Sequence, residues 1–485
     1  MIHSDLHGWL DAEDSIKCVL VEAVGHVGGD EVVHYFSSAG YVTTPACTPA
    51  NQVYLPYVDS IGSLNETLSL NGKPSISLGE ISLDNSEGNL DSLLDVIWTN
   101  RDVSVFIGDS RWPRDQFRRI YRGVIDDIVV KNRNSMSLKI MDRLQALNTP
   151  ISDAVLVDKD NALIPLCFGE VCNVTPTLVD ESLLEYQLHN GSVESIEEVR
   201  DKGVPVGYVP NNTNGTFTLT AKPFGQVTCS VKGDATGGYT DRVAPLISRL
   251  ATEYGSARTR FTTVDLDLDN LNDFDALHPQ CVGIYLDSRT NTLEVMSRLA
   301  DSVGASVTVS KEGLLRLHKI QAATGVPVLE IDEFDMVENS FSVRTRIPVI
   351  AAHKVAYNRN WTTQTDLATG LPESHRDQWE EDWKYVNSKD TAVADLYRLF
   401  DEPEPIETHL QIKSEAQQEA DRLTEFFKVQ RYIYSFQGFS KLLTLELADE
   451  VQITHSRFVS GSVLGLVVGL KGDWIKGTAT VEVLV

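Results

Sequence analysis

The chain has 485 residues, of which 42% are hydrophobic and 23% are charged, a composition typical of a packed globular protein and not of a disordered one. Its 42 basic and 69 acidic residues give a formal net charge of −27, which disfavours tight nucleic-acid binding because phosphates are repelled. Residues 1–8 are polar, and no apolar run reaches the roughly 20 residues that span a bilayer. We therefore expect a protein that is made in the cytoplasm and does not insert stably into membranes.

The six cysteines are scattered along the chain. Cys167 and Cys172 are close together, but their spacing does not match that of a usual zinc-ligand pair. The sequence therefore predicts free, mostly buried thiols and no disulfide framework.

The first 150 residues have the pattern of a small β-domain. Two apolar runs, 18–24 and 31–36, flank Gly28, Gly29 and Asp30, which favours a hairpin. Leu90, Leu93, Leu94, Ile97 and Trp98 share one face of a predicted helix. Further strands are predicted at 63–70 and around residues 105, 124 and 140. This order favours a barrel or sandwich covered by one helix.

Several ordered strings in this region resemble the first β-module of bacteriophage tail-tip (baseplate) hub proteins. They lie at residues 54–57, 75–83, 90–98, 103–109, 120–128 and 138–144. The resemblance continues in the string at residues 167–176, and it implies a part of an assembly and not a catalyst.

Beyond a boundary near residues 148–150, the chain changes character twice. Glycine, asparagine and short strand runs at residues 160–238 predict an all-β insert. Residues 239–330 predict a small α/β domain. Its first helix covers residues 243–254 with Thr240 or Asp241 as cap, and its second begins with a capping box of Asn291 and Glu294 and stops at Gly304. A hairpin around residues 311–313 follows.

The last predicted domain, residues 331–485, contains strand runs at 347–357, 431–436, 451–454, 463–470 and 479–485 and one helix near 414–428. The predicted fold is therefore mainly β with α+β elements. Two tube-like modules with one helix each, 1–150 and 331–485, flank the all-β insert and the small α/β domain.

The resemblance implies a structural virion protein of the tail tip, assembled in the host cytoplasm. It would close a ring, with a trimer favoured, around the tail channel, since three copies with two modules each match a six-fold tube. Its expected partners are the distal tail and tube proteins, a central fibre and peripheral receptor-binding proteins. DNA or a tape-measure protein would pass through an acidic lumen without specific binding. We expect no enzyme activity, and the sequence predicts no catalytic, cofactor-binding or metal-binding residue.

One alternative is a tip-associated hydrolase. Gly108-Asp109-Ser110 follows a predicted strand, as in Gly-Asp-Ser-Leu esterases, and Asp275 and His278 have the spacing of the partner residues in such enzymes, with Asn272 as a possible oxyanion donor. The hairpins around these residues favour a simple turn at Ser110 instead. Similarly, the acidic run at 264–275 suggests a calcium loop, but Asn270 and Ala276 stand where such a loop needs Gly and Glu.

Another alternative is a six-fold distal tail ring or a glycan-binding tail adhesin. Trp361, Trp379, Trp383 and Tyr385 lie among acidic residues, and exposed tryptophans would suit a glycan or a neighbouring tail protein. A helix that packs Trp379 and Trp383 against its own core explains the spacing equally well.

Overall fold

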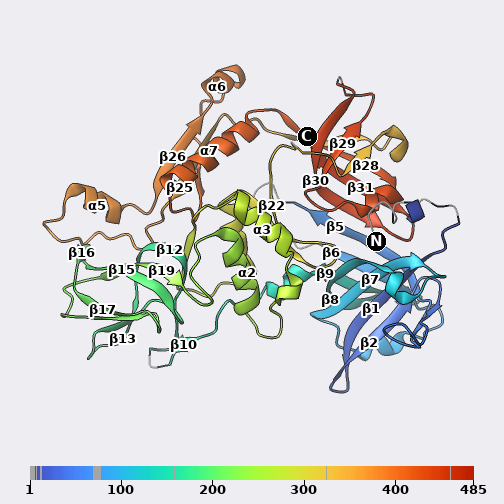
Figure 1. Ribbon diagram of the computed structural model, residues 1–485, viewed down its shortest axis with the longest axis horizontal. Coiled ribbons are helices and arrows are strands. Elements are labelled where there is room, and N and C mark those ends of the chain that lie inside the picture. The colour runs from blue at the N-terminus through green and yellow to red at the C-terminus, as the bar shows by residue number, and fades with distance from the viewer. Residues whose placement is uncertain are drawn as a thin grey trace.

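The computed structural model describes residues 6, 8–10, 12, 14–68, 78–157, 159–323, 325–458 and 460–485, and of residues 62–65 it describes the backbone alone. The fold is mainly β (Figure 1). Strands from both ends of the chain lie together on the right of Figure 1, whereas the middle of the chain and the first part of its last third form the centre and the left-hand part.

In the described part of the chain, thirteen strands form one large sheet. Its main path runs β2-β1-β7-β8-β9-β6-β5-β30-β31-β28-β24, and β29 and β23 branch from β30. The early strands are β1 (Lys17–Val27), β2 (Asp30–Ser37), β5 (Val58–Thr67), β6 (Leu78–Asp84), β7 (Arg101–Asp109), β8 (Arg118–Asn132) and β9 (Ser135–Asp142). The late strands are β23 (Leu329–Ile331), β24 (Ser342–Ile347), β28 (Arg431–Phe439), β29 (Glu450–Thr454), β30 (Ser462–Asp473) and β31 (Thr478–Leu484).

The two predicted β-rich regions thus share one sheet, joined where β5 pairs antiparallel with β30 from Leu64–Gly472 to Thr67–Gly469. One hydrophobic core includes Val58 and Ile61 from the early strands and Val481 and Val483 from the late ones. The first hairpin has its predicted turn, because Gly28 and Gly29 take the positive φ that a two-residue turn needs.

The helix predicted at residues 90–98 is wrong. A short 3-10 helix, η1 (Asp91–Asp95), lies there, and the chain is extended again at Val96. Leu90, Leu93 and Trp98 are buried, but Leu94 and Ile97 are 48% and 55% exposed. A 3-10 turn has three residues per turn, so it cannot keep an α-helical stripe on one face. The short strands β3 (Tyr41–Val42) and β4 (Val53–Tyr54) and the 3-10 helices η2 (Arg114–Gln116) and η3 (Arg143–Leu147) complete this region.

The middle of the chain begins with strands alone. A five-stranded sheet has the order β16-β15-β19-β12-β20, a four-stranded sheet has the order β13-β14-β18-β17, and β10 pairs with β11. The bounds are β10 (Val155–Leu156), β11 (Ala162–Leu163), β12 (Leu166–Val174), β13 (Thr177–Asp180), β14 (Glu185–Gln187), β15 (Val193–Asp201), β16 (Val204–Pro205), β17 (Tyr208–Asn211), β18 (Thr216–Leu219), β19 (Val227–Asp234) and β20 (Gly283–Leu286). Strand β20 comes from the following helical segment, which ties that segment to the insert.

The helical segment contains α2 (Val243–Glu253), α3 (Leu268–Leu277), α4 (Thr292–Asp301) and the hairpin of β21 (Ala305–Val309) and β22 (Leu315–Lys319), with η4 (Thr263–Asp265) before α3. The predicted hairpin is confirmed. The predicted cap of α2 is wrong, because Arg242 and not Thr240 or Asp241 occupies its N-cap position. Asn291 is the N-cap of α4, as predicted, but its side chain makes no cap hydrogen bond. The Asn291 amide instead donates to the Asn148 carbonyl oxygen at 2.9 Å.

The last third contains three α-helices, not the single predicted one: α5 (Glu373–Glu380), α6 (Thr391–Tyr397) and α7 (Lys413–Phe427). A separate sheet has the order β26-β25-β27. Its strands are β25 (Ala352–Tyr357), β26 (Lys384–Lys389) and β27 (Pro405–Glu407), and η5 (Glu333–Asp335) and η6 (Ser440–Thr444) lie outside it. The strand predicted at 347–357 is therefore two strands in different sheets, which part at Pro348. Among the described helices, none combines the length and the apolar character needed to cross a membrane.

Candidate assembly surfaces

One end of the large sheet is the open edge of β2. Val27 and Asp30 close the two-residue turn, so the backbone groups of alternate residues, starting with Glu31, point away from β1. Tyr35 and Ser37 follow this alternation, since the Tyr35 carbonyl oxygen and the Ser37 N–H bond the backbone of Leu55 at 3.1 and 2.7 Å. Residues 31–33 have no such partner in the described chain. Glu31 and Val33 therefore present free backbone groups.

The other end of the sheet is β24, which pairs on one side with β28. The residues of β24 before Ile347 are exposed. Arg344 forms an ion pair with Glu482 on β31, and the Arg346 Nε donates to the Gln430 Oε1 at 2.7 Å. The two edges differ in charge, because β2 begins with Asp30 and Glu31 whereas β24 contains two arginines. Arg101 partly compensates Glu31 at 3.1 Å.

The tip of the β21–β22 hairpin lies at the junction of the early and late strands. The Lys311 ammonium donates to the backbone carbonyls of Leu443 and Leu445 in and after η6. On the other side, Glu312 lies 3.7 Å from Arg118 of β8, and the Arg143 guanidinium donates to the Gly313 carbonyl at 3.3 Å. This hairpin tip thus contacts both halves of the large sheet.

Partly buried charged side chains surround this junction. Arg316 pairs with Asp267 at 2.5 Å and also with Glu446. Burial raises the pKa of the Glu66 carboxyl to about 7, although nearby Lys311 opposes the shift. Burial likewise raises the pKa of Asp449. The cations at the junction therefore do not fully neutralise its acidic groups.

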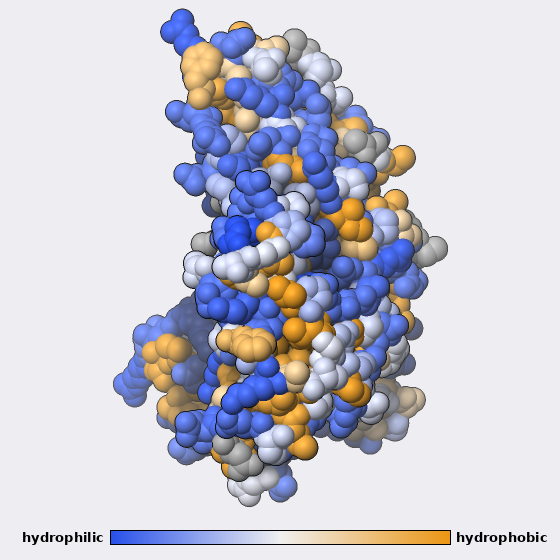
Figure 2. Space-filling model, turned by 90° about the vertical axis from the view of Figure 1, so that its left-hand side faces the viewer, coloured by the Kyte–Doolittle hydropathy of each residue, from blue (hydrophilic) through white to orange (hydrophobic). Residues whose placement is uncertain are grey.

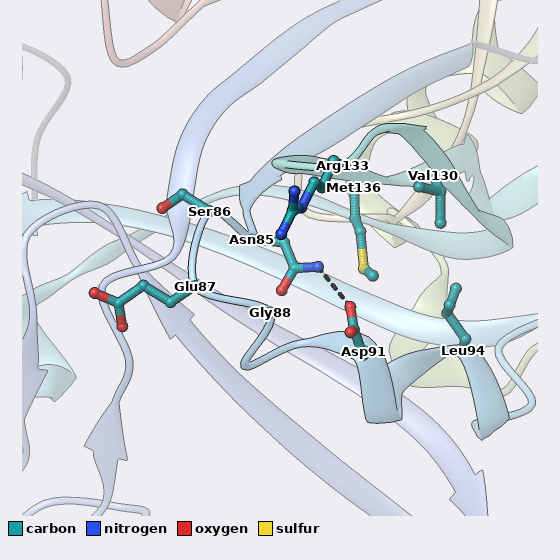
Figure 3. Close-up of a pocket in the computed structure, with 9 residues that line it drawn as sticks. All are labelled: Asn85, Ser86, Glu87, Gly88, Asp91, Leu94, Val130, Arg133 and Met136. Carbon is teal, nitrogen blue, oxygen red and sulfur yellow. Dashed lines mark hydrogen bonds between the residues drawn. The ribbon is translucent and has the colours of Figure 1, made fainter.

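A surface pocket of about 330 Å³ lies beside η1 (Figure 3). Asn85 organises it: its amide donates to Asp91 at 2.8 Å, and its carbonyl oxygen accepts from the Leu90 N–H at 2.9 Å. In Figure 3 the Glu87 side chain points away from these groups. The polar groups of Asn85 and Asp91 are thus used to hold the turn into η1.

The three residues of the possible hydrolase lie on two elements that are distant in the sequence. Ser110 follows β7, where its N–H donates to the Ile16 carbonyl at 2.9 Å. Asp275 lies on α3 and pairs with Arg242 at 2.5 Å, and His278 ends the same helix with its ring against Phe274. Within the described residues, no hydrogen bond or ion pair joins Ser110 to either. Asp109 instead anchors the turn through Arg111, whose guanidinium holds the pKa of that carboxyl well below its usual range.

The acidic run at 264–275 is used for capping and ion pairs. Asp265 pairs with Arg143 at 2.5 Å and Arg122 at 3.3 Å, and despite its burial these and other hydrogen bonds lower its pKa to about 2. Asp267 caps α3 by accepting from the Asn270 N–H. In the part of the chain that the structure describes, no group of three or more His, Cys, Asp or Glu side chains could hold a metal ion.

The tryptophans form an internal layer. Trp379 and Trp383 are 6% and 5% exposed, so the expectation of exposed tryptophans is wrong for both. Trp379 lies against the Arg200 guanidinium at 4.1 Å, and Arg359 lies over Trp361 at 4.2 Å and Trp383 at 5.3 Å. Helix α5 ends before Trp383, so the two side chains do not share one helix face.

The thiols are all free, as predicted, and those of Cys18, Cys47, Cys167 and Cys229 are buried. The sheet edges and the junction were not found from the sequence. Both depend on pairings between distant segments, and a local pattern contains no signal for these.

Neither a protein-family model nor a curated protein matches the sequence. Among solved structures, the chain is similar to a tail protein from Neisseria meningitidis MC58, at 10% identity over 97% of both chains with a TM-score of 0.40. It is similar to the 43 kDa tail protein of prophage MuSo2 from Shewanella oneidensis, at 10% identity over 96% of this chain and 98% of that one, with a TM-score of 0.41. It is also similar to the prophage tail protein gp18 from Listeria monocytogenes EGD-e, at 10% identity over 96% and 94%, with a TM-score of 0.34.

All three of these solved structures are of tail proteins. With 10% identity and TM-scores below 0.5, these likenesses assign no role to any residue of this chain.

Proposed function

We propose that this chain is a structural virion protein, a hub of the phage tail tip or baseplate that closes a ring around the tail channel. The observation that supports this is the large sheet, whose main path in the described chain ends in two open strands, β2 and β24. Free edges satisfy their backbone groups by pairing with another strand. If β2 of one copy pairs with β24 of the next, the contact is head-to-tail and repeats until the ring closes.

The charges at the two edges favour such a contact. The acidic start of β2 would lie against Arg344 and Arg346 of a neighbour, and opposite charges across strands are stabilising. We propose a trimer, because three copies would supply six strand-rich regions to a six-fold tube. The ring would join the tail tube to a central fibre and to peripheral receptor-binding proteins, at the tail tip of the virion.

We also propose that the protein works without catalysis. Ser110, Asp275 and His278 are held by separate structural contacts, so the role proposed for the chain is mechanical. The acidic excess of the chain, −27 in all, would let DNA or a tape-measure protein pass without binding. A fluorophosphonate probe that labels the protein at Ser110 would contradict this part of the proposal.

The first test is the assembly state of the purified protein, measured by light scattering and by negative-stain class averages of the same peak. A three-fold ring with a central hole is expected. A six-fold ring would favour the distal tail ring instead.

The second test is Val33→Pro, which removes an outward-facing N–H from β2 without removing a bond to β1. We expect the ring of this variant to dissociate at protein concentrations at least tenfold higher than those at which the wild-type ring dissociates. Its melting temperature should stay close to that of the wild type. Val33→Lys is a second variant with the same expected loss, because it places a positive charge opposite the arginines of β24. Val209→Lys, on the exposed strand β17, is the matched control. Rings that are unchanged in both Val33 variants would refute the β2–β24 contact.

A further inference from the structure

A groove of about 870 Å³ lies between α7 and β27 and reaches the end of β24 at Ile347. One wall is a stripe on α7 formed by Glu419, Arg422, Leu423, Phe426 and Phe427. This spacing places all five side chains on one face of the helix. Ala416 and Ala420, which lie on the same side of α7 as the stripe, are buried in the central core, and Leu423 packs partly against that core. Phe426 is buried and Leu423 and Phe427 are half-buried, so α7 presents a partly covered apolar surface to the groove.

The other walls are also largely apolar. Ile406 of β27 is 39% exposed, and Ile350 and Pro348 close one end of the groove. The stripe on α7 runs over nine residues, from Glu419 to Phe427, which corresponds to about 12 Å along the helix axis. This length suits two to three turns of another helix.

Uncompensated acidic groups line the groove. Glu404 and Glu407 are exposed, and in the described part of the chain neither forms an ion pair. Asp301 is partly buried, and its Oδ1 has no hydrogen-bond partner. The cation of the stripe, Arg422, is already bonded to Glu419, with its Nε 2.8 Å from the Oε2. The groove therefore favours a positively charged occupant.

Two other occupants fit less well. A strand added to β27 would meet Pro405, which has no N–H to donate. A second copy could offer α6 and the residues after it, where Leu396 and Phe400 are exposed, but the neighbouring Asp395 and Asp401 would face the acidic rim. The net charge of −27 also opposes this contact between copies.

We propose that this groove is the docking site for an amphipathic helix of a partner protein, with its apolar face on α7 and lysine or arginine residues beside Glu404, Glu407 and Asp301. This is helix-in-groove recognition, in which residues at positions i, i+3, i+4 and i+7 anchor the helix. Of the two strands proposed for the ring contact, β24 contributes only its buried last residue, Ile347, to the groove, and β2 contributes none. Docking in the groove therefore requires no β2–β24 contact. It adds a partner-binding role to the proposed function.

The test uses three fluorescent synthetic peptides and the full-length protein, with binding measured by anisotropy. Two peptides share a leucine stripe at helical spacing and differ in having lysine or glutamate on the flanks. The third has the sequence of residues 389–402. The lysine peptide is expected to bind at least tenfold more tightly than the glutamate peptide. The double variant Glu404→Lys, Glu407→Lys should reverse that order.

Leu423→Asp separates docking from non-specific attraction of a basic peptide to an acidic protein. It adds a negative charge, so non-specific attraction predicts equal or tighter binding of the lysine peptide, whereas docking predicts a loss of at least tenfold. Ile406→Asp, on the opposite wall, should have the same effect even if Leu423→Asp lowers the melting temperature. Val209→Asp adds the same charge outside the groove and should leave the affinity unchanged.

Three results would overturn the proposal: affinities weaker than about 100 μM for the lysine peptide, equal binding of the lysine and glutamate peptides, or unchanged binding in both aspartate variants. Tighter binding of the 389–402 peptide than of the lysine peptide would assign the groove to a second copy of this chain.

Discussion

Several side chains in this protein are ionisable but buried, and their pKa values show how the fold uses them. Asp301 ends α4, and burial raises its pKa from 3.8 to about 7. Asp265 is also buried, but two arginines and a capping box stabilise its charged form and lower its pKa. The two pKa values differ because the two carboxyls have different neighbours. Burial alone favours the neutral form of a carboxyl, whereas a nearby cation favours the charged form.

Asp301→Asn is expected to stabilise the protein more as the pH rises. The folded protein holds the proton of this carboxyl up to about pH 7, whereas the unfolded chain loses it near pH 4. The free energy of unfolding of the wild type therefore falls as the pH rises from about 4 to about 7. The asparagine does not titrate and removes this loss. The gain should be small at pH 4.5 and on the order of 2 kcal/mol at pH 8.

Melting temperatures of the wild type and Asp301→Asn across this pH range provide the measurement. Asp153→Asn is the control, because that exposed carboxyl is paired with Arg289 outside the core. A constant difference between wild type and Asp301→Asn at all pH values would show that the carboxyl does not titrate in this window.

At the scale of elements, the β21–β22 hairpin connects parts of the molecule that are distant in sequence. Its tip touches η6 through Lys311 and β8 through Glu312. Gly313 takes a φ of +78°, and a Cβ there would lie 3.1 Å from that of Arg122. Glycine is needed at this position for both reasons.

Lys311→Met should therefore destabilise the junction. It leaves the carbonyls of Leu443 and Leu445 without their donor, which costs about 1–3 kcal/mol. Thermal unfolding followed by circular dichroism measures the effect. Lys471→Met, on an exposed position of β30, is the matched control. Equal melting temperatures for the two variants would contradict the bridging role of the hairpin tip.

At the scale of the whole molecule, the large sheet couples the two ends of the chain. The β5–β30 pairing and the common core mean that early and late strands should open together. The middle of the chain has separate cores, one of them within the all-β insert. Local opening in the insert should therefore leave the large sheet protected.

Val481→Ala tests this coupling by hydrogen exchange of the full-length protein. It removes buried methyl groups from the late strands at a cost of about 2 kcal/mol, and we expect faster exchange in β6 and β9 as well as in β30. Val231→Ala makes the same change in the insert core and should not affect those strands. Faster exchange confined to β28, β30 and β31 in Val481→Ala would show that the early strands are stable without the late ones.

Much of the local structure follows from the sequence. The β1–β2 hairpin, the β21–β22 hairpin, α2 and α7 agree with their patterns, because turn glycines and apolar spacing act over a few residues. The prediction of a helix at residues 90–98 is wrong because the same leucines are compatible with a 3-10 turn, which places Trp98 in the core. Helix α6 was missed because its seven residues are too few to show a helical repeat of apolar positions. A helix at Trp379 was only an alternative interpretation, and α5 ends before Trp383.

The sequence by itself determined the mainly β character, the free cysteines and the resemblance to tail-tip hub proteins. Only the tertiary structure decided that β5 pairs with β30, which leaves β2 and β24 as the two edges. It also decided that Trp379 and Trp383 are inside and that one face of α7 lines an open groove. These outcomes depend on contacts between residues hundreds of positions apart, whose energies no local pattern contains.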